Sequence, residues 1–203
     1  MQLTTALLSL VAAAATTNAA PTDGAACVAP PRRFGIMALR SASPIHFASV
    51  SGFQNNLALK LPENELEAQC TDGVTRREAT FFIKDGELFL YTPKETIQKL
   101  WTDRSGMGTG VLQYATYPKD GSWTPGRNFE TKGWEIDEND NLLFKGSSFI
   151  ACPWDPKAPE TTKWTLYVNA GVSNPAWNEG CLGVTARTVT ASEPVRCTYP
   201  PRQ

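Results

Sequence analysis

Apolar and polar residues alternate over short runs along this chain, which is the pattern of half-buried β-strands. The clearest case is Ala79 to Tyr91, ATFFIKDGELFLY, where two β-rich runs flank Asp85-Gly86, a strong hairpin signal. Gly133 to Gly146, GWEIDENDNLLFKG, repeats the design with Asn139-Asp140-Asn141 at the turn. These two segments predict two β-hairpins.

Further runs of the same kind predict more strands. They are FGIMALRS, IHFASV and NLALKL in the N-terminal half, then KWTLYV at Lys163 to Val168 and CLGVTARTV at Cys181 to Val189. Helical periodicity is almost absent, and only Lys94 to Trp101 could form a turn or two of helix. Short strands at close spacing, with Gly, Pro and Asn between them, indicate an all-β sandwich or barrel.

The spacing of the two hairpins bears on the topology of this all-β fold. They begin about fifty residues apart when Phe82 is aligned with Trp134, and a weaker third copy begins near Phe34. Three such units favour a β-trefoil-like barrel, with a Greek-key β-sandwich as the alternative. We expect one compact domain over residues 20–203, since strands resume on both sides of every long loop.

The N-terminus has the pattern of a secretory signal peptide. Leu7 to Ala15 is an apolar run, too short to span a bilayer, and small residues follow it as far as Ala19 or Ala20. We therefore expect residues 1–19 to be a signal peptide and the rest to be secreted. No later segment approaches the roughly 20 apolar residues of a transmembrane helix. The C-terminal segment CTYPPRQ is polar, so we do not expect it to direct attachment of a lipid anchor.

The charge of the chain argues against two classes of partner. Nineteen basic and 20 acidic residues leave a formal net charge of −1, with both signs scattered along the sequence. No basic run is longer than a pair such as Arg32-Arg33. Nucleic acid and anionic membranes are therefore not expected as partners.

Five cysteines follow the expected signal peptide, and in an oxidising compartment most of them should be paired. They lack a CxxC spacing, so a zinc site is not expected. We favour Cys27 with Cys197, because the ends of a closed domain often lie close together, and Cys152 with Cys181. Cys70 is then unpaired, either buried and inert or free to form an intermolecular disulfide.

The glycine-rich segment DRSGMGTG, Asp103 to Gly110, resembles a ligand-binding loop in composition alone. A P-loop requires a Lys after the glycines, and a dinucleotide-binding loop opens a helix. Here the strand-like VLQYATY follows. We therefore expect a bulge or a tight turn.

Catalytic groups are hard to assemble from this sequence. The single histidine, His46, lies in an expected strand between Ile45 and Phe47, where a structural role is favoured. A two-His metal site is excluded by count. Paired carboxylates for glycoside hydrolysis stay open as an alternative, with Asp85, Glu87, Glu135, Asp137, Glu138 and Asp140 as candidates. Most of these flank hairpin turns, so we expect no catalytic residue, no cofactor and no metal.

The tryptophans are the more suggestive residues. Trp134 and Trp164 fall in strand patterns and are expected in the core. Trp123, Trp154 and Trp177 lie in polar, turn-rich segments, where an apolar ring beside hydrogen-bonding groups suits a sugar ring. These three are the candidate carbohydrate-binding residues. The alternative for each is a plug that holds its own loop onto the core.

Several strings of the chain, in consistent order, resemble the PhiA-type fungal cell wall proteins. They are CVAP at Cys27 to Pro30, Phe34-Gly35, ATFFIKDGELFLY, DRSGMGTG, GWEID, FIACP at Phe149 to Pro153, AGVSNP at Ala170 to Pro175, and CTY at Cys197 to Tyr199. The chain departs from the family in the basic PPRR after the first cysteine and in a longer PWDPKAPETTK loop.

The resemblance implies a secreted, non-catalytic wall protein involved in forming conidiophores, phialides and spore walls, with some relatives known as IgE-binding antigens. It supplies no catalytic residues and no ligand site. We expect wall polysaccharide as the partner, with an intermolecular disulfide as a further means of retention. The alternatives are a secreted carbohydrate-active hydrolase and a secreted effector that binds a host protein.

Overall fold

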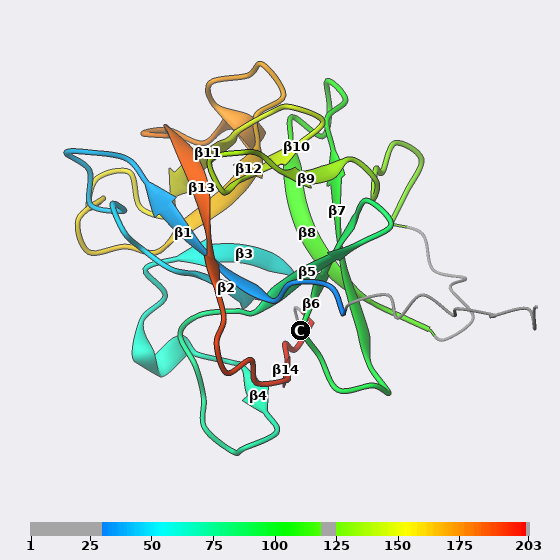
Figure 1. The fold of residues 1–203 in the computed structure, drawn as a ribbon. Helices are drawn as coiled ribbons and strands as arrows, with labels where there is room; N and C mark the ends of the chain where they lie inside the picture. Colours follow the sequence, from blue (N-terminus) through cyan, green and yellow to red (C-terminus); the bar gives the residue numbers. More distant parts are fainter. Residues whose placement is uncertain (1–29, 119–124, 202–203) are drawn as a thin grey trace, which may run out of the picture. The chain divides into compact units, whose positions relative to one another are not determined.

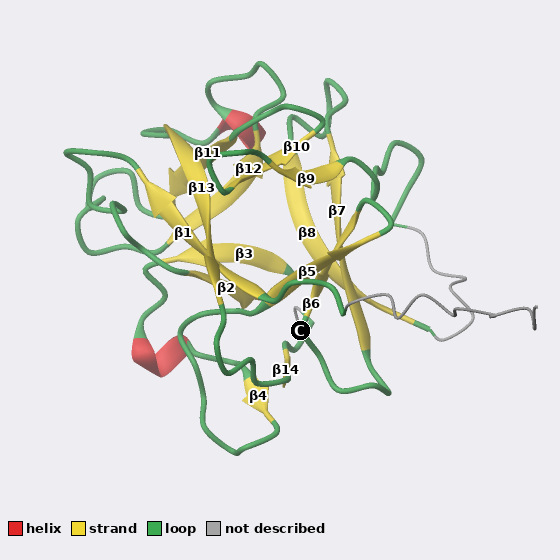
Figure 2. Cartoon of the chain, viewed as in Figure 1, coloured by secondary structure: helices red, strands yellow, loops and turns green. Residues whose placement is uncertain are grey.

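β-Strands dominate the computed structural model, which describes residues 30–118 and 125–201 (Figure 2). The strands are β1 (Phe34–Leu39), β2 (Val50–Phe53), β3 (Asn56–Leu59), β4 (Gln69–Cys70), β5 (Phe81–Lys84), β6 (Glu87–Leu90), β7 (Ile97–Asp103), β8 (Val111–Tyr117), β9 (Trp134–Ile136), β10 (Asn141–Phe144), β11 (Phe149–Pro153), β12 (Trp164–Val168), β13 (Leu182–Thr190) and β14 (Cys197–Thr198). Two 3-10 helices, η1 (Glu63–Glu65) and η2 (Pro175–Trp177), accompany them. The all-β class is confirmed. Within the described ranges no helix has the length and apolar character needed to cross a bilayer.

One antiparallel sheet of twelve strands carries the fold. Its hydrogen-bonded order is β1-β5-β6-β7-β8-β3-β12-β11-β13-β10-β9, and β2 pairs with β3. Because β1 also pairs with β13, from Phe34↔Thr190 to Leu39↔Thr185, the path from β1 to β13 returns to its start. Figure 1 shows β13 alongside β1. β4 and β14 form a separate two-stranded sheet.

Alternation along the strands places one set of side chains in a common core. In β1, Phe34, Ile36 and Ala38 are buried, while the residues between them are partly exposed. Trp134 and Trp164 are buried in the same cluster, as their strand patterns predicted. Burial of apolar surface on the inner side of the sheet is thus the main stabilising contribution.

Both predicted hairpins are present. β5 and β6 pair from Phe81↔Leu90 to Lys84↔Glu87, and Asp85 and Gly86 at the turn have φ values of 54° and 75°. Two central residues with positive φ match the strand twist in a two-residue hairpin loop. β9 and β10 form the second hairpin.

The turn of helix expected over Lys94 to Trp101 is wrong. From Ile97 the chain forms β7, in which Gln98, Leu100 and Thr102 are buried in alternation, and β7 pairs with β8 from Ile97↔Tyr117 to Asp103↔Val111. A seven-residue partner strand and period-2 burial outweigh a weak local helical tendency.

The strand expected over IHFASV begins only at its last residue. The segment before Val50 forms turns, and Phe47 has a φ of 64° and lies exposed. His46 accepts a hydrogen bond at Nδ1 from the Arg40 backbone N–H at 3.1 Å. The structural role favoured for His46 therefore matches its observed contact, although this contact is in a turn and not in a strand.

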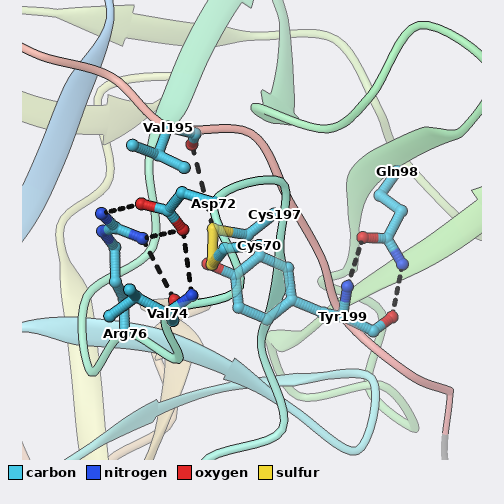
Figure 3. Close-up of a disulfide and its surroundings, with 8 residues drawn as sticks. All are labelled: Cys70, Asp72, Val74, Arg76, Gln98, Val195, Cys197 and Tyr199. Carbon is cyan, nitrogen blue, oxygen red and sulfur yellow. Dashed lines mark hydrogen bonds and ion pairs between the residues drawn. A yellow bond between two sulfur atoms is a disulfide. The ribbon is translucent and has the colours of Figure 1, made fainter.

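The cysteine pairing expected at the C-terminus is wrong. β4 and β14 are antiparallel with Cys70 opposite Cys197, and these two residues form a disulfide with a Cα–Cα distance of 3.9 Å (Figure 3). Cys70 is therefore not the unpaired thiol, and Cys197 does not pair with Cys27, which lies outside the described residues. The pairing of β4 with β14 brings Cys70 next to Cys197, whereas the expected pairing relied on the two chain ends lying close together. Because the other four cysteines are paired with one another, a disulfide to another molecule would have to use Cys27.

A buried glutamine holds the segment after this disulfide. Gln98, 1% exposed, donates from Nε2 to the Tyr199 carbonyl at 2.5 Å and accepts at Oε1 from the Tyr199 N–H at 2.9 Å (Figure 3). The Tyr199 side chain is also buried, and burial raises the pKa of its hydroxyl. A Cβ on Gly52 would lie 2.7 Å from Tyr199 Cδ1, so only glycine fits beneath the ring. The C-terminal segment is therefore part of the core.

Candidate functional site

The β12–β13 loop, residues 169–181, passes over β12 and is fixed at three places. The Ala176 N–H donates to Thr109 Oγ1 in the β7–β8 turn at 2.8 Å. The Asn178 amide donates to the Tyr167 hydroxyl of β12 at 3.1 Å. Cys181 forms a disulfide with Cys152, the pairing that the sequence favoured. Figure 1 shows the loop in orange at the top of the view, near the green β7–β8 turn.

Trp177 lies between the first two of these contacts and points into solvent. Its side chain is 79% exposed. Trp177 and its neighbour Ala176 have φ values of 58° and 52°, in the left-handed region that residues other than glycine seldom adopt. Such backbone conformations cost on the order of 1–3 kcal/mol each and are concentrated at functional sites. The fold therefore holds an indole ring in water at an energetic cost, which is the opposite of a loop plug.

The β7–β8 turn is formed by DRSGMGTG, and the turn interpretation of this segment is confirmed. The Ser105 N–H donates to Asp103 Oδ1 at 2.9 Å, and the Gly108 N–H donates to Ser105 Oγ at 3.2 Å. The turn also presents Met107, whose side chain is 81% exposed. Its glycines thus serve a compact turn that carries an exposed apolar residue.

One glycine of this turn explains its contact with the β12–β13 loop. Gly110 has a φ of 92°, and a Cβ there would lie 2.0 Å from the Val168 carbonyl oxygen. The Val168 N–H donates to the Gly110 carbonyl at 2.9 Å. This close approach of two backbones places Thr109, the residue before Gly110, where its hydroxyl can accept the bond from Ala176.

Trp154, the second candidate platform, is held in its own loop. Its Nε1 donates to Thr165 Oγ1 at 2.6 Å, and its ring centroid lies 5.8 Å from that of Phe53. The Lys163 ammonium lies 4.0 Å from the Trp154 ring centroid and is also paired with Glu65. With 47% of its surface exposed but its ring partly covered, Trp154 fits the plug alternative better than Trp177 does. Trp123 lies outside the described residues.

A polar hollow of about 650 Å³ opens at the start of the β12–β13 loop. It is lined by Arg104 and Ser105 of the β7–β8 turn, by residues 128–130, by Ser147 and by residues 169–171. Glu130 accepts two bonds from Arg104, at 2.9 and 3.1 Å, and this ion pair holds the pKa of the Glu130 carboxyl below its usual value. The hollow therefore offers fixed charges, hydroxyls and amides between the β7–β8 turn and the start of the β12–β13 loop.

Four of the six carboxylates considered for hydrolysis make structural contacts. Asp137 accepts hydrogen bonds from the N–H groups of Asn141 and Asn139 at 2.8 and 2.9 Å, and these bonds lower its pKa. Glu135 accepts from the Gly146 N–H at 3.0 Å. Asp140 pairs with Arg32 at 2.7 Å. Asp85 lies in the β5–β6 turn and Glu138 is exposed in the β9–β10 turn.

Glu87 differs because it is half-buried in the sheet. Burial raises its pKa, but hydrogen bonds from Thr131 at 2.6 Å and from Lys99 at 3.1 Å outweigh this, so the net shift is downward. A general acid of a glycosidase needs a raised pKa. Within residues 30–118 and 125–201, no three His, Cys, Asp or Glu side chains gather in a way that could hold a metal ion.

Sequence reasoning named Trp177 but missed the residues that position it. The acceptor role of Thr109, the exposure of Met107 and the contact of Asn178 with Tyr167 all depend on the tertiary approach of the β7–β8 turn to β12. A signal was present nevertheless, because DRSGMGTG and AGVSNP are both among the strings that carry the family resemblance. The structure adds that these two segments contact each other, through the hydrogen bond between Ala176 and Thr109.

These features define a class of protein: an all-β, disulfide-bonded domain that presents exposed apolar residues, Met107 and Trp177 among them, on two loops that contact each other. Comparison with known proteins identifies the family. The model of the family described as PhiA-like secreted protein matches residues 34–200. The chain is 40% identical to cell wall protein phiA of Emericella nidulans, over 98% of this chain and 99% of the relative. It is 38% identical to cell wall protein phiA of Aspergillus fumigatus, over 91% of this chain and 95% of the relative.

The chain therefore belongs to the PhiA-like secreted protein family. A third relative, cell wall protein phiA of Aspergillus niger, is 37% identical over 95% of this chain and 97% of its own length. Secretion and location in the fungal cell wall, expected from the N-terminus and the resemblance, are confirmed. No solved structure matches the chain at a significant level.

Proposed function

We propose that this protein is a non-catalytic component of the fungal wall that contacts wall polysaccharide through Trp177 and the loops around it. The observation that carries the proposal is a 79% exposed indole on a left-handed backbone, held by three contacts. An aromatic ring presented in this way binds the apolar face of a sugar ring with little loss of conformational entropy. Hydroxyls and amides of the hollow, which residues of the β7–β8 turn and the β12–β13 loop help to line, supply hydrogen bonds to a neighbouring sugar.

The biological setting of this binding follows the family. Formation of conidiophores, phialides and spore walls is the process in which we place the protein, and an exposed wall protein is accessible to antibodies as an IgE-binding antigen. The closed path of strands acts as a rigid, trefoil-like scaffold on which the loops are mounted. Four of the six candidate carboxylates of a hydrolase make structural contacts, and this favours binding over catalysis.

Co-sedimentation tests the proposal. Mature protein, residues 20–203, is mixed with insoluble chitin, with β-1,3-glucan and with whole fungal wall, and the pelleted fraction is measured for wild type, Trp177→Ala and Trp154→Ala. We expect wild type to pellet with at least one polymer and Trp177→Ala to bind about tenfold more weakly, or roughly 1.4 kcal/mol. Trp154→Ala should bind like wild type once its fold is verified by circular dichroism.

Two further variants make the result specific to the ring. Trp177→Tyr keeps an aromatic face and should retain most of the binding, whereas Trp123→Ala tests the remaining candidate platform. Equal pelleting of wild type and Trp177→Ala would contradict the proposal. Release of reducing sugar that persists after boiling controls are subtracted would instead favour the hydrolase.

A further inference from the structure

The outer face of the β5–β6 hairpin carries aromatic residues where an antiparallel sheet normally presents polar ones. Phe82 and Phe89 are opposite each other in the register, and their rings stack with centroids 5.1 Å apart and planes at 13°. Tyr91 packs edge-on against Phe82 at 6.4 Å. The inward residues of the same hairpin, Phe81 and Leu88, are fully buried in the core. The hairpin is therefore aromatic on both faces, and the outer face needs an explanation.

Two arginines from distant parts of the chain cover these rings. The Arg33 guanidinium lies 4.8 Å from the centroids of both Phe82 and Tyr91, and the Arg196 guanidinium lies 4.5 Å from that of Tyr91. Arg196 precedes Cys197 of the disulfide in Figure 3 and donates to the Thr92 carbonyl at 3.0 Å. Stacking uses the flat faces of the guanidinium groups, and Arg33 also donates from one terminal nitrogen to the Pro31 carbonyl, which leaves the other terminal nitrogen of each arginine for a ligand.

These residues line a groove of about 390 Å³, which is within the range of roughly 300–1,000 Å³ for small-ligand sites. We call it the basic groove. The residues that line it include four cations, Arg33, Lys84, Lys94 and Arg196, and no Asp or Glu. The chain as a whole has a net charge of −1, so this is a local accumulation of positive charge and not a general excess.

The four cations of the basic groove carry charge that no acidic side chain of the described residues neutralises in an ion pair. Seven ion pairs occur among the described residues, and none of them includes a cation of the groove. The Arg33 Nε is buried and has no hydrogen-bond partner within residues 30–118 and 125–201. A buried N–H without an acceptor is costly, and an anionic oxygen is its strongest partner.

We propose that the basic groove binds an acidic sugar chain, one whose rings carry carboxylate or phosphate groups. Lys84, Lys94, Arg33 and Arg196 supply the positive charge, and the partly exposed Phe89 and Tyr91 contact the apolar faces of the sugar rings. A secreted wall protein meets carbohydrate as its surroundings, which favours an acidic glycan over other polyanions. This surface is separate from Trp177 and does not depend on the function proposed for that residue.

Binding of matched soluble ligands to mature protein tests the proposal. A tetramer of galacturonic acid supplies carboxylates, and a phosphorylated mannan fragment supplies phosphates. The methyl-esterified galacturonate tetramer has the same rings without charge, and tetraglutamate has the charge without rings. We expect one or both acidic glycans to bind more tightly than the ester and tetraglutamate, and to weaken as salt rises. The tighter acidic glycan identifies the anion.

Two double variants locate the binding. Lys84→Gln/Lys94→Gln removes two exposed cations of the basic groove, whereas Arg127→Gln/Lys157→Gln removes two exposed cations elsewhere. We expect about fivefold weaker binding for the first pair and no change for the second, since exposed ion pairs contribute modestly. Trp177→Ala should bind the acidic glycan like wild type, so failure here is distinguishable from failure of the wall-binding proposal.

Three results would overturn the inference. Equal binding of the ester would remove the role of charge, and equal or tighter binding of tetraglutamate would remove the role of the sugar ring. Equal weakening by the two double variants would place the interaction outside the basic groove. Because all four substituted side chains are exposed, loss of folding does not complicate the comparison.

Discussion

The two disulfides of the described chain serve opposite purposes. Cys70–Cys197 closes the C-terminal segment onto the sheet, and the next residues run inward to Tyr199, which is buried and held by Gln98. Cys152–Cys181 instead closes the β12–β13 loop, whose tryptophan points outward. The first disulfide secures a segment that is already part of the core. The second fixes a loop that has little core contact of its own.

The comparison shows that the surroundings of a cross-link decide its role. Near Cys70–Cys197, the backbone N–H and C=O of Tyr199 both have a partner in the buried Gln98. Around Cys152–Cys181, the loop keeps two residues in left-handed conformations and leaves Trp177 in water. The first disulfide therefore secures the core, and the second holds the loop that we propose contacts the wall.

Removing either disulfide should have the largest effect on the free energy of unfolding. Cys70→Ala/Cys197→Ala opens a link with a sequence separation of 127, and Cys152→Ala/Cys181→Ala opens one of 29. Loop-closure entropy predicts losses of about 4–5 and about 3–4 kcal/mol in the free energy of unfolding. Urea unfolding measures both values. Among molecules that stay folded, only the second variant should lose wall binding. Wall binding retained by the second variant would contradict the account.

Gln98→Leu should give the next largest effect. The change leaves the N–H and C=O of Tyr199 buried without partners, and we expect a loss of about 3 kcal/mol. Gln113→Leu is the matched control, because Gln113 bonds to Asn56 on the outer side of β8 and should cost about 1 kcal/mol or less. Urea unfolding of both variants checks the difference. Similar losses in the two would show that Gln98 does not hold the segment.

Thr109→Val separates the position of Trp177 from the stability of the fold. Valine keeps the shape of Thr109 but cannot accept the bond from Ala176, so the loop should loosen near Trp177. We expect a stability change of about 1 kcal/mol or less and severalfold weaker wall binding. Thr109→Ser keeps the hydroxyl and should bind like wild type. Hydrogen exchange of the Ala176 amide reports the loosening, and unchanged exchange in Thr109→Val would refute it.

The smallest effect concerns the exposed ion pair beside Cys70. Asp72 accepts hydrogen bonds from Arg76 and from the Val74 N–H, and these lower its pKa to about 2 (Figure 3). Its stabilising contribution is present above the unfolded pKa of about 3.9 and is lost as pH falls through about 2. Asp72→Asn should remove this part of the acid dependence. Arg76→Gln should do the same, and unfolding measured between these pH values tests both.

Most of the fold could be predicted from local patterns. The Asp85-Gly86 turn, the alternation in β1 and the burial of Trp134 all follow from period-2 patterning and turn chemistry. β7 was missed because its seven-residue partner strand lies outside any local window. The Cys70–Cys197 pairing was missed for a similar reason, since β4 and β14 are two-residue strands with almost no sequence signal.

The candidate site was predictable in its residue but not in its geometry. The polar residues around Trp177 identified it as a candidate, but those around Trp154 identified Trp154 equally well. The structure distinguishes the two, because Lys163 covers the Trp154 ring and Thr165 accepts a hydrogen bond from its Nε1. The basic groove had no signal at all. Its cations come from four separate segments, so a sequence with scattered charge gave no warning of a positive surface.

Oxidative footprinting of the tryptophans tests the central claim most directly. The mature protein is treated briefly with N-bromosuccinimide, free and bound to whole fungal wall, and oxidation at each tryptophan is measured by mass spectrometry. The account predicts that Trp177 is oxidised faster in the free protein than the other tryptophans within residues 30–118 and 125–201 and is protected by the wall, while Trp154 changes little. Buried Trp164 serves as the internal control for unfolding. Equal oxidation of Trp177 in the free and bound protein would contradict the claim that this ring is the contact with the wall.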